Sequence, residues 1–169
     1  EPVDIPQDVG KLLSKSLVAS DENGQMKPYL LEGWEVNNDA TVFKFKLKSD
    51  LKWVDGTPIK ASDLNFTIPN TEVSVLDDKT IQFKLKESYS PFPSLFTKPV
   101  FKKGTLLGSG PYKIEKIEKS KIFITKIRLV SKQDDLPVIF IRFYPSEKVA
   151  VTGFNLGEVS VLLGLSNQF

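Results

Sequence analysis

The chain has 169 residues, of which 40% are hydrophobic and 26% are charged, and its 23 basic and 21 acidic side chains leave a formal net charge of +2. This composition argues against disorder, the length predicts a single domain over residues 1–169 or one lobe of a larger protein, and the small net charge makes nucleic acid a poor partner. Since histidine and cysteine are absent, the chain cannot form a Ser-His-Asp or Cys-His nucleophile system, a zinc site of the usual nitrogen and sulfur type, or a disulfide.

The first predicted element is a short helix near the N-terminus. Pro6 suits its first turn, and apolar residues follow at helical spacing: Val9, Leu12, Leu13 and Leu17. Further along, residues 61–66 are long enough for one helical turn.

Strands dominate the middle of the chain. Residues 42–48 alternate so that Phe43, Phe45 and Leu47 share one face and lysines the other, and residues 81–86 repeat the pattern. Residues 73–75, joined through Asp77-Asp78, form the predicted hairpin partner of the second strand. Aromatic and basic residues on opposite faces indicate ordinary amphipathic strands and not a base-stacking surface.

A second β region follows at residues 112–117 and 122–129, with a turn near Lys119-Ser120. Residues 138–144 are apolar enough to predict a central strand. A helix is expected over residues 145–155, closed by Gly157. These elements predict an α+β fold of mainly antiparallel or mixed sheets with a few short helices.

Residues 47–67, which include Trp53-Val54-Asp55-Gly56-Thr57-Pro58, resemble the signature of the peptide/nickel class of ABC-transporter substrate-binding proteins, extracellular solute-binding family 5. Further matches follow in the family's order, upstream at Leu31-Glu32-Gly33-Trp34 and downstream at Asp77–Ile81, Tyr89–Phe92, Gly108–Ile114 and Gly157–Val159.

This resemblance implies one lobe of a two-lobe, type II periplasmic-binding-protein fold, with the second lobe absent from this chain. It implies the substrate-binding component of an ABC importer, which captures an extended peptide or a related small solute between its lobes and delivers it to a membrane permease. It also implies an extracytoplasmic location, with a lipid anchor in the full-length protein, and no enzyme activity or cofactor. The alternative from another class is a stand-alone extracellular interaction module built on the same lobe.

The resemblance also suggests where a ligand lies. In peptide-binding relatives the segment before the first helix runs along the ligand backbone, and here it corresponds to Val3, Asp4 and Ile5. Trp53 and Tyr112 are further candidates as cleft aromatics, although a buried anchor beneath its turn is the favoured interpretation of Trp53, since large aromatic side chains usually belong to the core. A packing role is expected for four other aromatics: Tyr29, Tyr89, Phe92 and Phe96.

Other site types find little support in the sequence. Gly108-Ser109-Gly110-Pro111-Tyr112 lacks the lysine and spacing of a phosphate loop, so a bend into a strand is expected. Imidazole is absent, so a metal is expected only as part of a chelate. Acidic residues are expected as turn caps or solvated surface and not as a catalytic pair: Glu32, Glu35, Asp50, Asp55 and Asp63.

No apolar run approaches the ~18 residues of a membrane span. The chain opens on Glu1-Pro2-Val3-Asp4 without the charged and apolar regions of a signal peptide. If the protein is exported, we expect this sequence to belong to its mature part.

Overall fold

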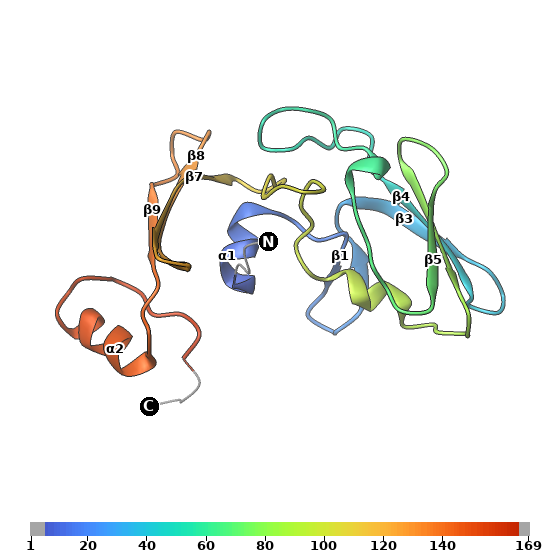
Figure 1. Cartoon of the computed structure of the whole chain (residues 1–169). Helices are drawn as coiled ribbons and strands as arrows, with labels where there is room; N and C mark the ends of the chain where they lie inside the picture. The colour runs from blue at the N-terminus through green and yellow to red at the C-terminus, as the bar shows by residue number, and fades with distance from the viewer. Residues whose placement is uncertain (1–5, 166–169) are drawn as a thin grey trace. The chain divides into compact units, whose positions relative to one another are not determined.

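A computed structural model describes residues 6–165 and divides the chain into two compact units, residues 1–111 and 112–169 (Figure 1). The first unit contains α1 (Gln7–Leu13), β1 (Val18–Ser20), β2 (Met26–Pro28), β3 (Leu31–Val36), β4 (Val42–Leu47), the 3-10 helix η1 (Ala61–Asp63), β5 (Thr71–Val75), β6 (Thr80–Leu85) and the 3-10 helix η2 (Phe92–Phe96). The second contains β7 (Tyr112–Ser120), β8 (Phe123–Ser131), β9 (Ile139–Arg142) and α2 (Glu147–Asn155). All pairings between these strands are antiparallel, which confirms the predicted α+β class.

The main sheet of the first unit has the strand order β3-β4-β6-β5. Its central strand β4 carries the predicted alternation, because Phe43, Phe45 and Leu47 are buried while Lys44 and Lys46 are exposed. The β5–β6 hairpin also forms as predicted. Period-two alternation therefore sets both the register of this sheet and its buried face.

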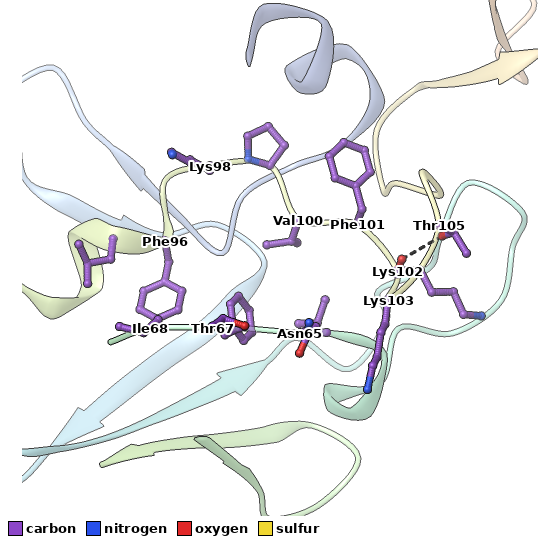
Figure 2. Close-up of a pocket in the computed structure, with 15 residues that line it drawn as sticks. Asn65, Thr67, Ile68, Phe96, Lys98, Val100, Phe101, Lys102, Lys103 and Thr105 are labelled. Carbon is purple, nitrogen blue, oxygen red and sulfur yellow. Dashed lines mark hydrogen bonds between the residues drawn. The ribbon is translucent and has the colours of Figure 1, made fainter. Parts of the chain in front are cut away.

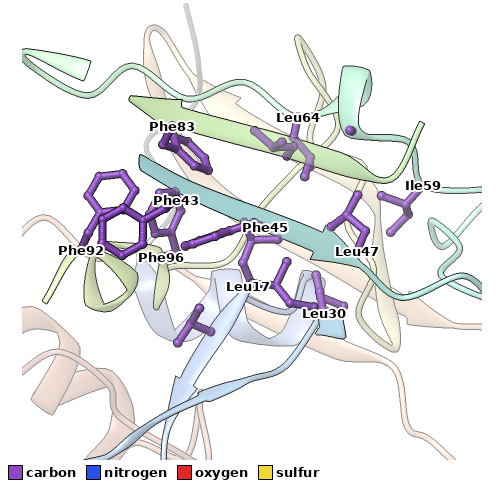
Figure 3. Packing of buried hydrophobic residues seen from close by; sticks show 14 of the residues in the cluster. Leu17, Leu30, Phe43, Phe45, Leu47, Ile59, Leu64, Phe83, Phe92 and Phe96 are labelled. Atoms are coloured by element: carbon purple, nitrogen blue, oxygen red, sulfur yellow. The ribbon is translucent and has the colours of Figure 1, made fainter. Parts of the chain in front are cut away.

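An aromatic cluster fills the core beneath this face (Figure 3). The ring centroid of Phe45 lies 5.2 Å from that of Phe83 and 4.8 Å from that of Phe96, and the two pairs meet edge to face. Helix η2 supplies Phe96 and Phe92, whose predicted packing roles are confirmed. Rings of this size each contribute roughly 1.5–3 kcal/mol of burial free energy.

The packing prediction is wrong for Tyr29 and Tyr89, each of which is 43% exposed. Both tyrosines lie outside the regular strands, and the phenylalanines already fill the space beneath the sheet. The Tyr29 ring instead lies 5.4 Å from the ammonium of Lys15, an arrangement that suits a surface aromatic.

The N-terminal helix is shorter than predicted. Helix α1 ends at Leu13, because Ser14 is extended and its hydroxyl donates to the carbonyl oxygen of Val100 and accepts from the backbone N–H of Ser109. Leu17, predicted on the helical face, is instead buried in the core beside β1. The turn predicted over residues 61–66 likewise ends early, at Asp63.

In the second unit the strand order is β7-β8-β9. The prediction that residues 138–144 form a central strand is wrong, because β9 occupies an edge and, among the described residues, pairs only with β8. Apolar character did not indicate burial here, since Phe140 is 56% exposed. The ammonium of Lys126 lies 4.8 Å from the centroid of the Phe140 ring, a cation–π contact at the surface.

Two boundaries in the second unit follow local chemistry. The turn predicted near residues 119–120 falls one residue later, where Lys121 has φ +56°. The helix predicted over residues 145–155 is confirmed as α2: the Ser146 hydroxyl accepts from the backbone N–H of Val149, and Gly157 follows the helix with φ +75°.

Candidate functional site

Trp53, the first aromatic candidate, is a buried anchor in the first unit. Its side chain is 2% exposed, and its indole N–H donates to Oδ2 of Asp63 at 3.1 Å. The turn above it is closed by the N–H of Gly56, which has φ +91° and donates to the carbonyl oxygen of Trp53 at 2.8 Å. The structure therefore matches the structural interpretation of Trp53, and contact between its ring and a ligand stays a prediction.

Tyr112, the second aromatic candidate, begins β7 in the second unit. It is 5% exposed, and its hydroxyl donates to the carbonyl oxygen of Pro137 at 3.1 Å. This bond ties the start of β7 to the residues that lead into β9. The two aromatic candidates thus belong to different units, and each is engaged within its own.

The remaining candidates, Val3, Asp4 and Ile5, lie outside the described residues. Their predicted role along a ligand backbone stays a prediction.

The segment from Gly108 to Pro111 is a tightly packed bend before β7. The N–H of Ser109 donates to the hydroxyl of Ser14 at 3.0 Å, and the N–H of Gly110 donates to the carbonyl oxygen of Leu13 at 2.8 Å. A Cβ on Gly108 would lie 2.1 Å from that carbonyl oxygen. Because these amides are already bound within the protein, the bend has the structural role predicted for it and does not cradle a phosphate.

Two of the acidic residues considered for a catalytic pair, Glu32 and Asp55, have structural partners. Glu32 pairs with Lys46 at 2.8 Å and raises the pKa of that lysine, mainly through their hydrogen bond. Asp55 accepts from both the N–H and the hydroxyl of Thr57, at 2.8 and 2.6 Å, within its turn. Each carboxylate serves local structure.

A cavity of about 430 Å³ opens within the first unit, between residues 64–68 and residues 95–105 (Figure 2). Leu64 is buried, Phe66 and Ile68 are half-buried, and Asn65 and Thr67 face solvent, so this segment alternates like a strand although it belongs to no sheet. The Phe66 ring lies 5.3 Å from that of Phe96 and thereby joins the cavity floor to the aromatic core.

Sequence reasoning missed this cavity. A usable signal was present, because no acidic residue occurs between Glu87 and Glu115 while lysines recur there. The alternation of Leu64, Phe66 and Ile68 was a second signal for an extended segment.

The described part of the chain contains neither a metal-binding cluster of side chains nor a helix that could span a membrane. No group of three histidine, cysteine, aspartate or glutamate side chains within residues 6–165 is placed to hold a metal ion. Among the same residues, no helix has the length and apolar character that crossing a membrane requires.

Comparisons with known proteins show similarity of this chain to bacterial solute-binding proteins. A family model described as "Bacterial extracellular solute-binding proteins, family 5 Middle" matches residues 25–71. A probable peptide ABC transporter periplasmic-binding protein of Sinorhizobium fredii is 26% identical in an alignment 127 residues long, gaps included, that covers 58% of this chain and 24% of that protein. The periplasmic oligopeptide-binding protein OppA of Escherichia coli is 39% identical over 59 residues, which are 35% of this chain and 11% of OppA.

Among solved structures, NikZ from Campylobacter jejuni in complex with Ni(L-His) superposes with a TM-score of 0.70 at 20% identity, covering 88% of this chain and 37% of NikZ. This likeness shows the fold. The family model and the relatives agree with the resemblance to family 5 solute-binding proteins seen in the sequence. The chain spans only about a quarter of the length of the first of these relatives.

Proposed function

We propose that this chain supplies one lobe of the substrate-binding component of an ABC importer, and that this lobe contributes to the capture of an extended peptide or a related small solute for delivery to a membrane permease. Both units belong to that lobe, and the second lobe lies elsewhere in the protein. The observation that carries the proposal is the fold, which matches a solute-binding protein over 88% of this chain but only 37% of the other.

The proposed mechanism is closure of two lobes around the solute. A ligand held between lobes shifts a hinge equilibrium by its greater affinity for the closed form, and main-chain hydrogen bonds to an extended peptide leave its side chains free to vary. In this chain the backbone of Val3, Asp4 and Ile5 is proposed to run along the ligand, with Trp53 and Tyr112 as aromatic contacts. The protein works outside the cytoplasm, held at the membrane by a lipid anchor, and performs no catalysis.

Calorimetric titration of a mixed pool of di- to pentapeptides tests this mechanism. The pool is titrated into the 169-residue chain and, in parallel, into the protein encoded by the longest open reading frame that contains it. We expect the longer protein to bind and the 169-residue chain to bind at least tenfold more weakly, because one lobe presents only part of the contact surface. Equal affinity for the two proteins would overturn two-lobe capture and favour the stand-alone module.

The proposed ligand backbone contact has its own test in the longer protein. Asp4→Pro removes one backbone N–H, whereas Asp4→Ala keeps it and removes only the side chain. We expect the proline variant alone to weaken peptide binding. Equal affinities of the two variants would remove residues 3–5 from the site.

A further inference from the structure

The cavity in the first unit is bordered by a length of backbone with free hydrogen-bonding groups. Within residues 6–165, no backbone N–H or C=O group of residues 65–67 forms a hydrogen bond to another part of the chain. Leu64 has extended backbone angles, and the exposure of residues 64–68 alternates as in an extended segment, with Asn65 and Thr67 facing solvent. Such an edge pairs readily with another extended chain.

The opposite wall carries uncompensated positive charge. Lys98, Lys102 and Lys103 line the cavity, and no aspartate or glutamate of residues 6–165 lines it. Lys98 and Lys103 are exposed and Lys102 is half-buried, and within the described part of the chain none of the three forms an ion pair. This wall is complementary to carboxylates.

Both walls are held in place by hydrogen bonds. The turn at residues 102–105 is closed by the Thr105 N–H and hydroxyl, which donate to the carbonyl oxygen of Lys102 at 3.0 and 2.9 Å. The Lys103 N–H donates to the carbonyl oxygen of Asp63 at 2.7 Å and thereby links this wall to the start of the free edge. Figure 2 shows Phe96 directed across the cavity toward Thr67 and Ile68. The site is therefore formed before any ligand binds.

We propose that this cavity binds an extended internal segment of an acidic polypeptide. About three residues of that segment, or about 10 Å of extended chain, pair with the backbone of residues 65–67. Its carboxylates meet the three lysines, and its apolar side chains lie against the floor at Phe66 and Phe96. An internal segment fits better than a free peptide because, among the described residues, the lining holds no carboxylate for an α-amino group. The site lies wholly in the first unit and uses none of the residues proposed for solute capture.

The direct probe is the blocked pentapeptide acetyl-Glu-Val-Glu-Val-Glu-amide, titrated into the full 169-residue chain at low salt. Its matched control has glutamine in place of each glutamate. Backbone amide shifts measured by NMR report whether residues 65–68 are the contact. We expect the acidic peptide to bind at least about tenfold more tightly than the glutamine peptide, to lose affinity as salt is added, and to shift the amides of residues 65–68.

Two sets of variants separate charge from backbone pairing. Substituting Lys98, Lys102 and Lys103 with glutamine removes the basic wall, and the charge-matched control substitutes the exposed lysines Lys48, Lys84 and Lys86. Thr67→Pro removes one backbone N–H donor without breaking a hydrogen bond formed within residues 6–165, and Thr67→Ala is its control. We expect the triple lysine variant of the cavity and Thr67→Pro each to weaken binding of the acidic peptide at least about tenfold. Both control variants should leave that binding unchanged. Circular dichroism checks that every variant is folded.

Four results would overturn the proposal: no binding of the acidic peptide, equal binding of the acidic and glutamine peptides, binding that survives loss of the three lysines, or tighter binding of the same peptide with free termini. If Thr67→Pro does not fold, the amide shifts of residues 65–68 decide whether the edge is the contact. If the longer protein fails to capture a solute, the proposal for this cavity still stands, because the blocked pentapeptide and the cavity variants test it independently of the peptide pool and the Asp4 variants.

Discussion

Asp63 receives two hydrogen bonds on one carboxylate oxygen, from the indole N–H of Trp53 at 3.1 Å and from the backbone N–H of Lys60 at 3.0 Å. The pair joins the turn at residues 53–58 to η1. It also satisfies the one polar atom of a tryptophan that is 2% exposed. The hydrogen bond between Trp53 and Asp63 thus links two parts of the motif at residues 47–67.

Loss of this bond is predicted to destabilise the first unit. Trp53→Phe keeps an aromatic ring but removes the donor, so Asp63 loses a hydrogen bond to a charged group. We expect the free energy of unfolding to fall by about 2 kcal/mol, measured by urea denaturation followed by circular dichroism. Trp34→Phe is the matched control, since Trp34 is only partly buried in the same cluster. Equal losses in the two variants would show that the hydrogen bond contributes nothing beyond ring size.

The bend before β7 is predicted to admit no side chain at Gly108. A Cβ there would lie 2.1 Å from the carbonyl oxygen of Leu13, and backbone atoms cannot move aside cheaply. We expect Gly108→Ala to lower the free energy of unfolding by at least about 2 kcal/mol in urea denaturation.

The control for Gly108→Ala is Gly33→Ala, a change in β3 where a Cβ meets nothing within 4 Å. It is expected to be neutral or to stabilise by up to about 1 kcal/mol, because alanine loses less backbone entropy on folding. Comparable destabilisation by both changes would contradict the steric argument.

The hairpin between β1 and β2 is predicted to make stability depend on acid pH. The backbone N–H groups of Gln25 and Asn23 donate to Oδ1 of Asp21 at 2.8 and 2.9 Å, and with the ammonium of Lys27 they lower the pKa of this carboxyl. A pKa lowered by folding contributes stability that is present above the unfolded value of about 3.9 and is lost as pH falls through the folded value.

Asp21→Asn should therefore reduce the midpoint of urea unfolding more at pH 7 than at pH 3. The control is Asp50→Asn, an exposed carboxyl on the loop after β4. If Asp21→Asn lowers the midpoint of urea unfolding by the same amount at pH 7 and at pH 3, the pH dependence does not come from the lowered pKa of Asp21.

Local pattern was enough to predict most of the strands. Phe43, Phe45 and Leu47 alternate with lysines, and this arrangement can bury an apolar face only as a strand. The family motifs supplied what periodicity could not, namely the two-lobe class. The prediction failed at Leu17, because the end of α1 depends on hydrogen bonds from Ser14 to Val100 and Ser109, which are distant in sequence.

Local pattern alone could not place the cavity or the edge position of β9, for a related reason. Apolar residues such as Phe140 predict burial only if another layer covers them, and pattern does not reveal which layers exist. Likewise, Lys98, Lys102 and Lys103 can be recognised as a wall of the cavity only when residues 64–68 are placed opposite them. Of the candidate site residues, Trp53 is buried as its structural interpretation predicts. The ligand contacts stay predictions for all five candidates: Val3, Asp4, Ile5, Trp53 and Tyr112.

The first unit is predicted to fold without the second. Its core cluster is drawn entirely from residues of the first unit, from Leu17 to Phe96, whereas the hydrophobic side chains buried in the second unit are, among the described residues, Tyr112, Ile127 and Leu129. A fragment of residues 1–111 should therefore keep a near-ultraviolet circular dichroism signal and unfold cooperatively in urea. A fragment of residues 112–169 should show neither property, because the burial of so small a core does not offset the conformational entropy lost on folding. A cooperative transition in the second fragment, or none in the first, would show that stability is shared between the units. If the first fragment folds, binding of the acidic peptide to it should match binding to the full chain, since every residue of that cavity lies before Pro111.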